Sequence, residues 1–459
     1  MAANPVANDD AAYYTTINTD LVVALASNPG PLLANDIDID GGALTSSVVA
    51  SPTSGTLIAF GTNGTFTYRP NNSFQGIDTF TYKVNDGTLD GNTATVSIAV
   101  GTKLLAKQNL DNNIVDSDSG GLLTTGGLKL SEAITPDQAL VYRSDSLAKP
   151  IIAVETQLAP GVAVPTAITA QLTFNGVAGT TYSYSMSGIV AGQPMRFALQ
   201  ADGTALATGM YNYSVSVGTT ISGTTTYQTF TGQQAIVNRA TSEYGANWWL
   251  SGLDRVYDSA AGALLVQGDG DTLWFKKSGS TYLHADGDTS YGTFVKSGST
   301  YTLTAKTGEL SNFSALGLLT SRVDTNANTV SFAYADRNSD GIANELITIT
   351  DPFGRVTNVN YTSSKVSSVA HFSGRTTTLT ISSGNLTGYT LTDPDGAGPL
   401  AAPAFAFAYA SAGKISSRTD AVSYTTSYSF NATDGRLRTL THPDTKTWQL
   451  IPSETVGLP

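Results

Sequence analysis

The chain has 459 residues, of which 45 are glycine and none is cysteine, and its formal net charge is −12 at neutral pH. That length predicts about three domains, and the lack of cysteine excludes disulfides and thiolate metal sites. The acidic excess argues against nucleic acid or an anionic membrane as a partner and favours divalent cations.

Alternating apolar and polar residues between glycine-rich turns predict an all-β protein. We expect tandem β-sandwiches followed by a β-hairpin repeat array. The expected parts are a sandwich at 1–100, a linker at 101–130, a second sandwich at 131–239 and a β-rich repeat region at 240–459. No apolar run is long enough to predict membrane insertion, and no leader peptide opens the chain. We therefore interpret the chain as a piece of a larger precursor.

The first expected sandwich contains the clearest strand patterns. Thr65–Tyr68 and Thr79–Val84 alternate strictly, which places one face of each strand in a core. The segment resembles the bacterial cadherin-like, immunoglobulin-type repeats of large surface proteins. The matching stretches are Pro5–Asp10, Leu33–Gly41, Gly64–Tyr68, Phe74–Tyr82 and Asn85–Gly87. The resemblance implies a bacterial extracellular or cell-surface location.

Acidic residues in this segment suggest a Ca²⁺ site. Asp36, Asp38 and Asp40 alternate, so their carboxylates lie on one side of an extended chain and converge where it turns at Gly41. The resemblance places further candidate ligands near the ends of the domain, namely Asp9, Asp10, Asp78 and Asp86. The alternative is that these residues only start turns.

The second expected sandwich runs from 131 to 239. Gln171–Phe174 and Tyr211–Val215 alternate as strands do, and a helical turn is expected at Ser131–Ala133. The Tyr, Ser and Thr content of this part suits a sugar-binding surface, although a spacer between modules is the favoured interpretation.

A sequence repeat occurs several times from residue 319 onward. An apolar residue is followed five positions later by Asp or His, and ten positions after that by an aromatic or aliphatic residue. The instances are Leu319/Asp324/Tyr334, Leu346/Asp351/Tyr361, Val366/His371/Ile381 and Ile415/Asp420/Phe430, with a fifth opening at Leu437 and His442. Such units cannot bury their apolar faces alone and must stack.

These repeats, with the upstream Tyr244–Trp249 and Gly268–Gly270, resemble the YD repeats of the RHS family. The resemblance implies hairpins wound into a β shell. Asp324 and Asp351 are 27 positions apart whereas Asp351 and His371 are 20 apart, so seven residues are inserted between the first two repeats.

The insertion has the pattern D-x-N-x-D-G of a calcium loop. The candidate ligands are Asp336, Asn338, Asp340, the carbonyl of Ile342, Asn344 and Glu345. Position 12 is Ile347 rather than an acid, and flanking helices are not expected, so the loop is more similar to isolated Asp-rich calcium loops than to an EF-hand. An acidic turn is the alternative.

No motif for catalysis stands out. Of three histidines, His371 and His442 occupy the Asp position of the repeat, and no nucleophile elbow, zinc-protease motif or phosphate loop is present. We therefore expect no enzyme but a calcium-stabilised structural or adhesive fragment of a large bacterial surface or secreted protein. Its expected partners are other copies of itself or cell-surface and matrix components. The alternatives are the delivery or encapsulation portion of a polymorphic RHS toxin, and a carbohydrate-binding or glycoside-acting surface protein.

Overall fold

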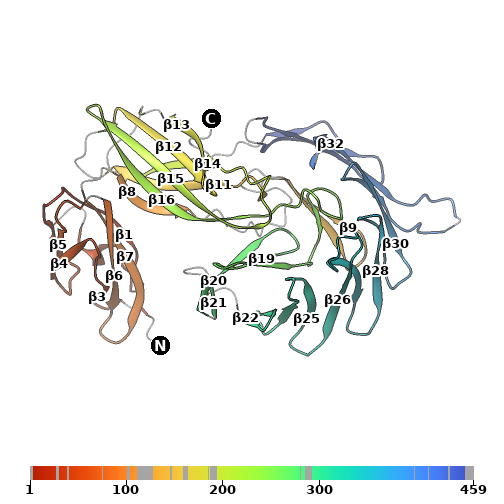
Figure 1. Ribbon diagram of the computed structural model, residues 1–459, viewed down its shortest axis with the longest axis horizontal. Helices are drawn as coiled ribbons and strands as arrows, with labels where there is room; N and C mark the ends of the chain where they lie inside the picture. Colours follow the sequence, from red (N-terminus) through yellow and green to blue (C-terminus); the bar gives the residue numbers. More distant parts are fainter. Residues whose placement is uncertain are drawn as a thin grey trace.

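The computed structural model describes most of the chain as β-structure (Figure 1). The described residues are 4–26, 30–38, 41–74, 76–100, 104–110, 128–144, 147–158, 164–184, 186, 194–279, 281–284, 292–396, 398–411, 413–432 and 435–449. The helical structure within them is limited to 3-10 turns, of which η1 (Leu32–Ala34) is the longest. The predicted all-β class, with tandem sandwiches ahead of a hairpin array, is confirmed.

The first sandwich packs two sheets around aromatic residues. One sheet has the order β1-β7-β6-β3 and the other β2-β5-β4. Their strands are β1 (Asp10–Thr15), β2 (Leu21–Val23), β3 (Thr45–Ala50), β4 (Gly55–Phe60), β5 (Phe66–Pro70), β6 (Gly76–Asn85) and β7 (Asp90–Val100). The alternation in β5 and β6 buries Phe66, Tyr68, Phe80 and Tyr82 in this core, as predicted.

The second sandwich begins inside the stretch expected to be a linker. Its sheets have the orders β14-β11-β8 and β13-β12-β15-β16. The strands are β8 (Leu104–Leu110), β11 (Ile151–Leu158), β12 (Ala167–Phe174), β13 (Val177–Tyr184), β14 (Pro194–Gln200), β15 (Gly209–Ile221) and β16 (Thr224–Ile236). Because β8 pairs with β11, residues 104–110 are part of a sheet and not of a linker.

Two small sheets follow the second sandwich along the chain. The sheet β18-β19-β20-β21 comprises β18 (Arg255–Asp258), β19 (Gly262–Val266), β20 (Thr272–Ser278) and β21 (Thr281–His284). The other, here called the inner sheet, has the order β17-β10-β9 and comprises β9 (Lys129–Ala133), β10 (Ala139–Arg143) and β17 (Trp248–Leu250). The helical turn expected at Ser131–Ala133 is wrong, since these residues pair with β10 as a strand.

The largest element is an antiparallel sheet of 15 described strands that pair in sequence order. It is called the meander, and its strands follow an arc from β22 through β26, β28 and β30 to β32 (Figure 1). The strands are β22 (Thr293–Ser297), β23 (Thr300–Thr304), β24 (Leu310–Phe313), β25 (Leu319–Val323), β26 (Thr329–Ala335), β27 (Glu345–Thr350), β28 (Val356–Thr362), β29 (Lys365–Ala370), β30 (Thr376–Ser382), β31 (Asn385–Thr390), β32 (Ala404–Ser411), β33 (Lys414–Thr419), β34 (Thr425–Phe430), β35 (Leu437–Thr441) and β36 (Thr447–Gln449).

The repeat residues mark a recurrent bulge. The third residue of each repeat lies at a register shift, at Tyr334, Tyr361, Ile381 and Phe430. A bulge bends and twists the strand that carries it, so its recurrence accounts for the curvature of the sheet. The first residue of each repeat is fully buried and pairs across the bulge, as Leu346 does with Tyr334.

The Asp or His of each repeat closes a hairpin turn. The backbone amide of Asp351 donates to the Arg355 carbonyl at 3.0 Å, and its Oδ1 accepts the amides of Phe353 and Arg355 at 2.9 Å each. His371 and His442 make the same backbone bond to the residue four positions on. The residue at this position therefore stabilises the turn, which explains why either Asp or His can occupy it.

The inner sheet packs against one face of the meander. Trp248, Tyr142 and Leu140 are fully buried in one core with residues of β27 to β35. The Tyr142 hydroxyl donates to the Gly413 carbonyl at 2.8 Å, and the Trp248 indole N–H donates to the Tyr409 hydroxyl at 3.0 Å. β10 pairs with β17, so this sheet joins residues on both sides of the domain boundary expected between 239 and 240. Residues 128–143 therefore pack with the repeat region and not with the second sandwich.

Candidate functional site

Two carboxyl groups in the first sandwich converge on one tyrosine. The Tyr82 hydroxyl oxygen lies 3.1 Å from Asp10 Oδ2 and 3.0 Å from each carboxylate oxygen of Asp36. The carbonyl oxygen of Asn8 lies 3.2 Å from the same atom, and that of Leu32 lies 3.5 Å from it. Carboxylate, carbonyl and hydroxyl oxygens are the donors that a hard cation prefers.

The electrostatics of this group reflect a shortage of hydrogen-bond donors. One hydroxyl proton can serve only one of the two carboxylates at a time, and no ion pair to either of them is described. Burial is the main cause that raises the pKa of Asp10 to about 7, and the neighbouring Asp36 and Asp9 add to the rise. Burial likewise raises the pKa of Asp36, against the hydrogen bond from the Asn8 amide. The site therefore favours either a proton or a cation between the two carboxyl groups.

The remaining predicted ligands of this segment bond to nearby amides. Asp9 Oδ1 accepts the Thr95 amide at 2.6 Å, Asp38 Oδ2 accepts the Gly42 amide at 2.5 Å, and Asp86 Oδ1 accepts the amides of Thr88 and Leu89 at 2.7 Å each. Asp40 lies outside the described residues. The structure thus brings Asp10 and Asp36 together, ties Asp9 to an amide of β7, and gives Asp38 and Asp86 local partners in turns.

Asp78 is a buried structural carboxylate. It is 2 % exposed and accepts the amides of Thr53 at 3.2 Å and Ser54 at 3.0 Å. It also accepts the Tyr68 hydroxyl at 2.8 Å and its neighbour Thr79's amide at 3.0 Å. A carboxylate with four donors is fully satisfied, so the expectation that Asp78 serves as a metal ligand finds no support in its surroundings.

The predicted calcium loop is a series of tight turns on an exposed connection between β26 and β27. Asp336 Oδ1 accepts the Ser339 amide at 2.6 Å and Oδ2 accepts the Gly341 amide at 2.9 Å. Asn338 Nδ2 donates to Asp340 Oδ2 at 2.9 Å. Gly341 has a φ of 85°, as the sharp turn at the sixth loop position requires. The oxygen-bearing side chains of positions 1, 3 and 5 therefore share one turn.

The last three candidates of this loop are placed differently. The Ile342 carbonyl accepts the Asn344 amide at 3.0 Å. Glu345 is 6 % exposed, and its Oε2 accepts the Arg337 amide at 3.1 Å at the base of the loop. Across the part of the chain that the structure describes, no three carboxylate or histidine side chains are grouped closely enough to hold a metal as they stand. Ca²⁺ at either location stays a prediction.

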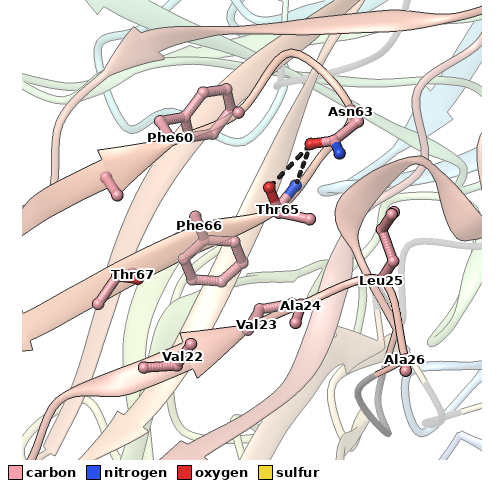
Figure 2. Close-up of a pocket in the computed structure, with 12 residues that line it drawn as sticks. Val22, Val23, Ala24, Leu25, Ala26, Phe60, Asn63, Thr65, Phe66 and Thr67 are labelled. Carbon is pink, nitrogen blue, oxygen red and sulfur yellow. Dashed lines mark hydrogen bonds between the residues drawn. The ribbon is translucent and has the colours of Figure 1, made fainter.

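Two hollows lie in the described surface. One, of about 680 Å³, lies where β2 ends beside the β4–β5 hairpin and is lined by Val22–Ala26, Ala59–Gly61, Asn63 and Thr65–Thr67. Figure 2 shows apolar side chains around it and the two hydrogen bonds between Asn63 and Thr65. The other, of about 540 Å³, has Arg375 and Asp393 among its lining residues. Neither hollow brings two carboxyl groups, or a histidine, into its lining.

The structural residues that sequence reasoning missed form a buried ionic group in the inner sheet. Glu132 is 3 % exposed and accepts hydrogen bonds from both Nε and Nη2 of Arg418. The Tyr389 hydroxyl donates to Glu132 Oε2 at 2.7 Å. No local signal identifies this group, because 286 residues separate its charged partners. Tyr82 was recognisable as core from its alternating strand, whereas the target of its hydroxyl was not.

No helix among the described residues has the length and apolar character needed to cross a bilayer. No curated protein sequence matches the chain significantly. Residues 2–102 match the family model of the bacterial cadherin-like domain. This match confirms the resemblance found for the first segment, and the two-sheet arrangement with its aromatic core agrees with it.

Several solved structures are similar to the chain at low sequence identity. The N-terminal eight Ig domains of Down Syndrome Cell Adhesion Molecule are 14% identical, with 69% of this chain and 36% of that chain covered and a TM-score of 0.16. The EC3–6 fragment of protocadherin gammaB7 is 12% identical, with 88% and 95% covered and a TM-score of 0.16. The human desmocollin-1 ectodomain is 12% identical, with 97% and 78% covered and a TM-score of 0.15. At these TM-scores the likenesses carry no argument about function.

Proposed function

We propose that the chain is a structural and adhesive segment of a large bacterial surface or secreted protein, stiffened by Ca²⁺. The observation that carries the proposal is the match of residues 2–102 to the bacterial cadherin-like domain. The same segment contains the Asp10–Asp36 pair, whose negative charge has no cationic side chain described beside it. We expect no enzymatic activity, no nucleic-acid partner and no membrane insertion of this segment.

The calcium proposal rests on the donor sets of two places. At the first, Asp10 and Asp36 would hold the ion, with help from the Asn8 carbonyl. At the second, Asp336, Asn338 and Asp340 would hold it. A bound cation removes the repulsion between neighbouring carboxylates and ties together segments that are distant in the chain. Asp10 opens β1 and Asp36 follows η1, so a cation there would fasten these two elements.

The repeat region would act as a rigid scaffold for the adhesive modules. The recurrence of the buried apolar residue, the Asp or His turn and the bulge supports the interpretation of these units as YD repeats of the RHS type. A second function, the encapsulating portion of a polymorphic toxin, is favoured by one observation. The meander is a continuous curved sheet whose apolar face packs on a segment of its own chain, which is how the wall of a shell would begin.

Calcium-dependent adhesion between copies of the chain tests the main proposal. Beads coated with the whole chain are expected to aggregate in Ca²⁺ and to disperse in EDTA. The double variant Asp10→Asn with Asp36→Asn should aggregate less in Ca²⁺. Asp202→Asn removes an exposed carboxylate of the second sandwich, whose side chain is 65% exposed, and should behave like the wild type.

Equal behaviour in Ca²⁺ and EDTA would count against a calcium-dependent homophilic role. A second outcome is that coated beads fail to aggregate yet bind bacterial or matrix surfaces in Ca²⁺. That result would support an adhesive role and exclude adhesion between copies of the chain.

A further inference from the structure

The sheet β13-β12-β15-β16 of the second sandwich has one face that covers the core and one that faces away from it. Ile168, Ala170, Val215 and Val217 are buried on the core side. Their strand neighbours alternate to the opposite face. Apart from Ala167, Ala178, Met210 and Ala235, the residues of that outer face are Thr169, Gln171, Thr173, Thr181, Ser183, Asn212, Ser214, Ser216, Gly218, Thr220, Thr225, Tyr227, Thr229, Thr231 and Gln233. Met210 and Ala235, at one end of it, pack against β19.

This outer face carries hydroxyl and amide groups and no charge. The chain has 60 charged Asp, Glu, Lys and Arg residues, yet none lies in 156–195 or in 203–238, the stretches that supply the four strands. Charged residues normally populate an exposed sheet face and keep it from non-specific association. A neutral face of this extent is suited to a neutral ligand, because binding one leaves no buried charge unpaired.

One aromatic ring lies on this face. Tyr227 is 70% exposed and is paired across the ladder with Gly218, which is paired in turn with Thr169 and then Ser183. A Cβ at residue 218 would lie 2.8 Å from Tyr227 Cε1, 3.1 Å from its Cδ1 and 2.7 Å from Thr169 Oγ1. The ring therefore extends over the glycine, where any larger residue would displace it, and one ring face is left toward solvent.

We propose that this face binds a neutral, flat glycan chain, with Tyr227 as the stacking platform. An aromatic ring gains from contact with the apolar C–H face of a pyranose. The row from Tyr227 to Ser183 crosses four strands and spans roughly 14 Å, and the row beside it supplies Gln171 and Thr229 as hydrogen-bonding partners. This inference rests on the proposed adhesive role and assigns a ligand class to it.

Titration calorimetry of the whole chain with cellohexaose, a neutral and extended β-linked hexasaccharide, tests the inference. The wild type should bind, and Tyr227→Ala should weaken the association by about tenfold or more, the loss expected for one stacking contact. Val177→Ala is the matched control, because Val177 is 71% exposed at the start of β13 and lies outside the row. Gly218→Val should weaken binding as well, since it displaces the ring while keeping Tyr227.

Two results would overturn the inference. One is a wild type that does not bind cellohexaose at millimolar concentration, and the other is a Tyr227→Ala variant that binds as the wild type does. Calcium-dependent bead aggregation reports separately on the adhesive role. Aggregation without cellohexaose binding would therefore remove only the glycan assignment, whereas glycan binding without aggregation would remove the homophilic role.

Discussion

Asp10 and Asp36 share one neutral hydrogen-bond donor, and that arrangement sets how the first sandwich responds to protons and cations. The Tyr82 hydroxyl is within 3.1 Å of both carboxyl groups. Burial raises the pKa of both carboxyl groups, and that of Asp10 reaches about 7. A proton at this position would therefore compete with the cation that we propose to bind there.

The pH dependence of the first sandwich follows from this pKa. The pKa of Asp10 is higher in the folded than in the unfolded chain, so the folded state binds more protons between about pH 4 and pH 7. Without Ca²⁺, the contribution of Asp10 to the free energy of unfolding should therefore be largest below about pH 4. This contribution should fall as the pH rises to 7. We expect a loss of about 2 kcal/mol, since partial exposure reduces the full effect of the shift.

Hydrogen exchange of the β6 and β7 amides in the whole chain measures this change between pH 4 and pH 8, after correction for the intrinsic exchange rate. Asp10→Asn should flatten the dependence, because the amide does not titrate. A profile of the wild type that is already flat, or that rises with pH, would contradict the assignment.

At the scale of elements, the inner sheet is fixed to the meander by buried and half-buried polar contacts that join distant parts of the chain. Glu132 in β9 pairs with Arg418 in β33 and accepts the hydroxyl of Tyr389 in β31. His371 Nε2 lies 2.9 Å from Asp137 Oδ2, next to the turn between β9 and β10. These contacts specify where the inner sheet lies on an otherwise apolar face.

Removing Glu132 should be costly, because it leaves Arg418 and Tyr389 without their buried partner. We expect Glu132→Ala to lower the free energy of unfolding of this region by about 3–5 kcal/mol. The double variant Glu132→Met with Arg418→Met should recover most of that loss, since it removes both charges. Urea unfolding followed by tryptophan fluorescence measures this cost, because Trp248 and Trp249 lie in the inner sheet and neither sandwich contains a tryptophan. A cost below about 1 kcal/mol for Glu132→Ala would show that the pair is dispensable.

Local patterns were sufficient for strands and turns, and insufficient for long-range pairing. The alternation in Thr79–Val84 and the Asp351 turn predict their structures because strand and turn preferences act over a few residues. The strand Lys129–Ala133 pairs with the nearby β10, but it was missed because the contacts that hold it on the meander, from Tyr389 and Arg418 to Glu132, lie more than two hundred residues away. Asp78 was proposed as a ligand because the family resemblance places it near an end of the domain. Its four hydrogen-bond donors, from Thr53 to Thr79, meet only in the folded sandwich and leave no signal in the local sequence.

At the scale of the whole molecule, two kinds of architecture follow one another. The sandwiches are closed units with their own aromatic and aliphatic cores. The meander does not close on itself, because each described strand pairs only with its neighbours in sequence. Such a sheet can be lengthened by repeats without altering the units before it. We interpret the molecule as modules for contact attached to a scaffold of adjustable length.

Differential scanning calorimetry of the whole chain in Ca²⁺ and in EDTA tests the central claim most directly. Binding to the folded state alone stabilises by about 2.7 kcal/mol when the free ion is at 100 times its dissociation constant. The account predicts a melting transition that rises with free Ca²⁺, and a rise that Asp10→Asn with Asp36→Asn reduces. Superimposable melting curves in Ca²⁺ and EDTA would contradict it.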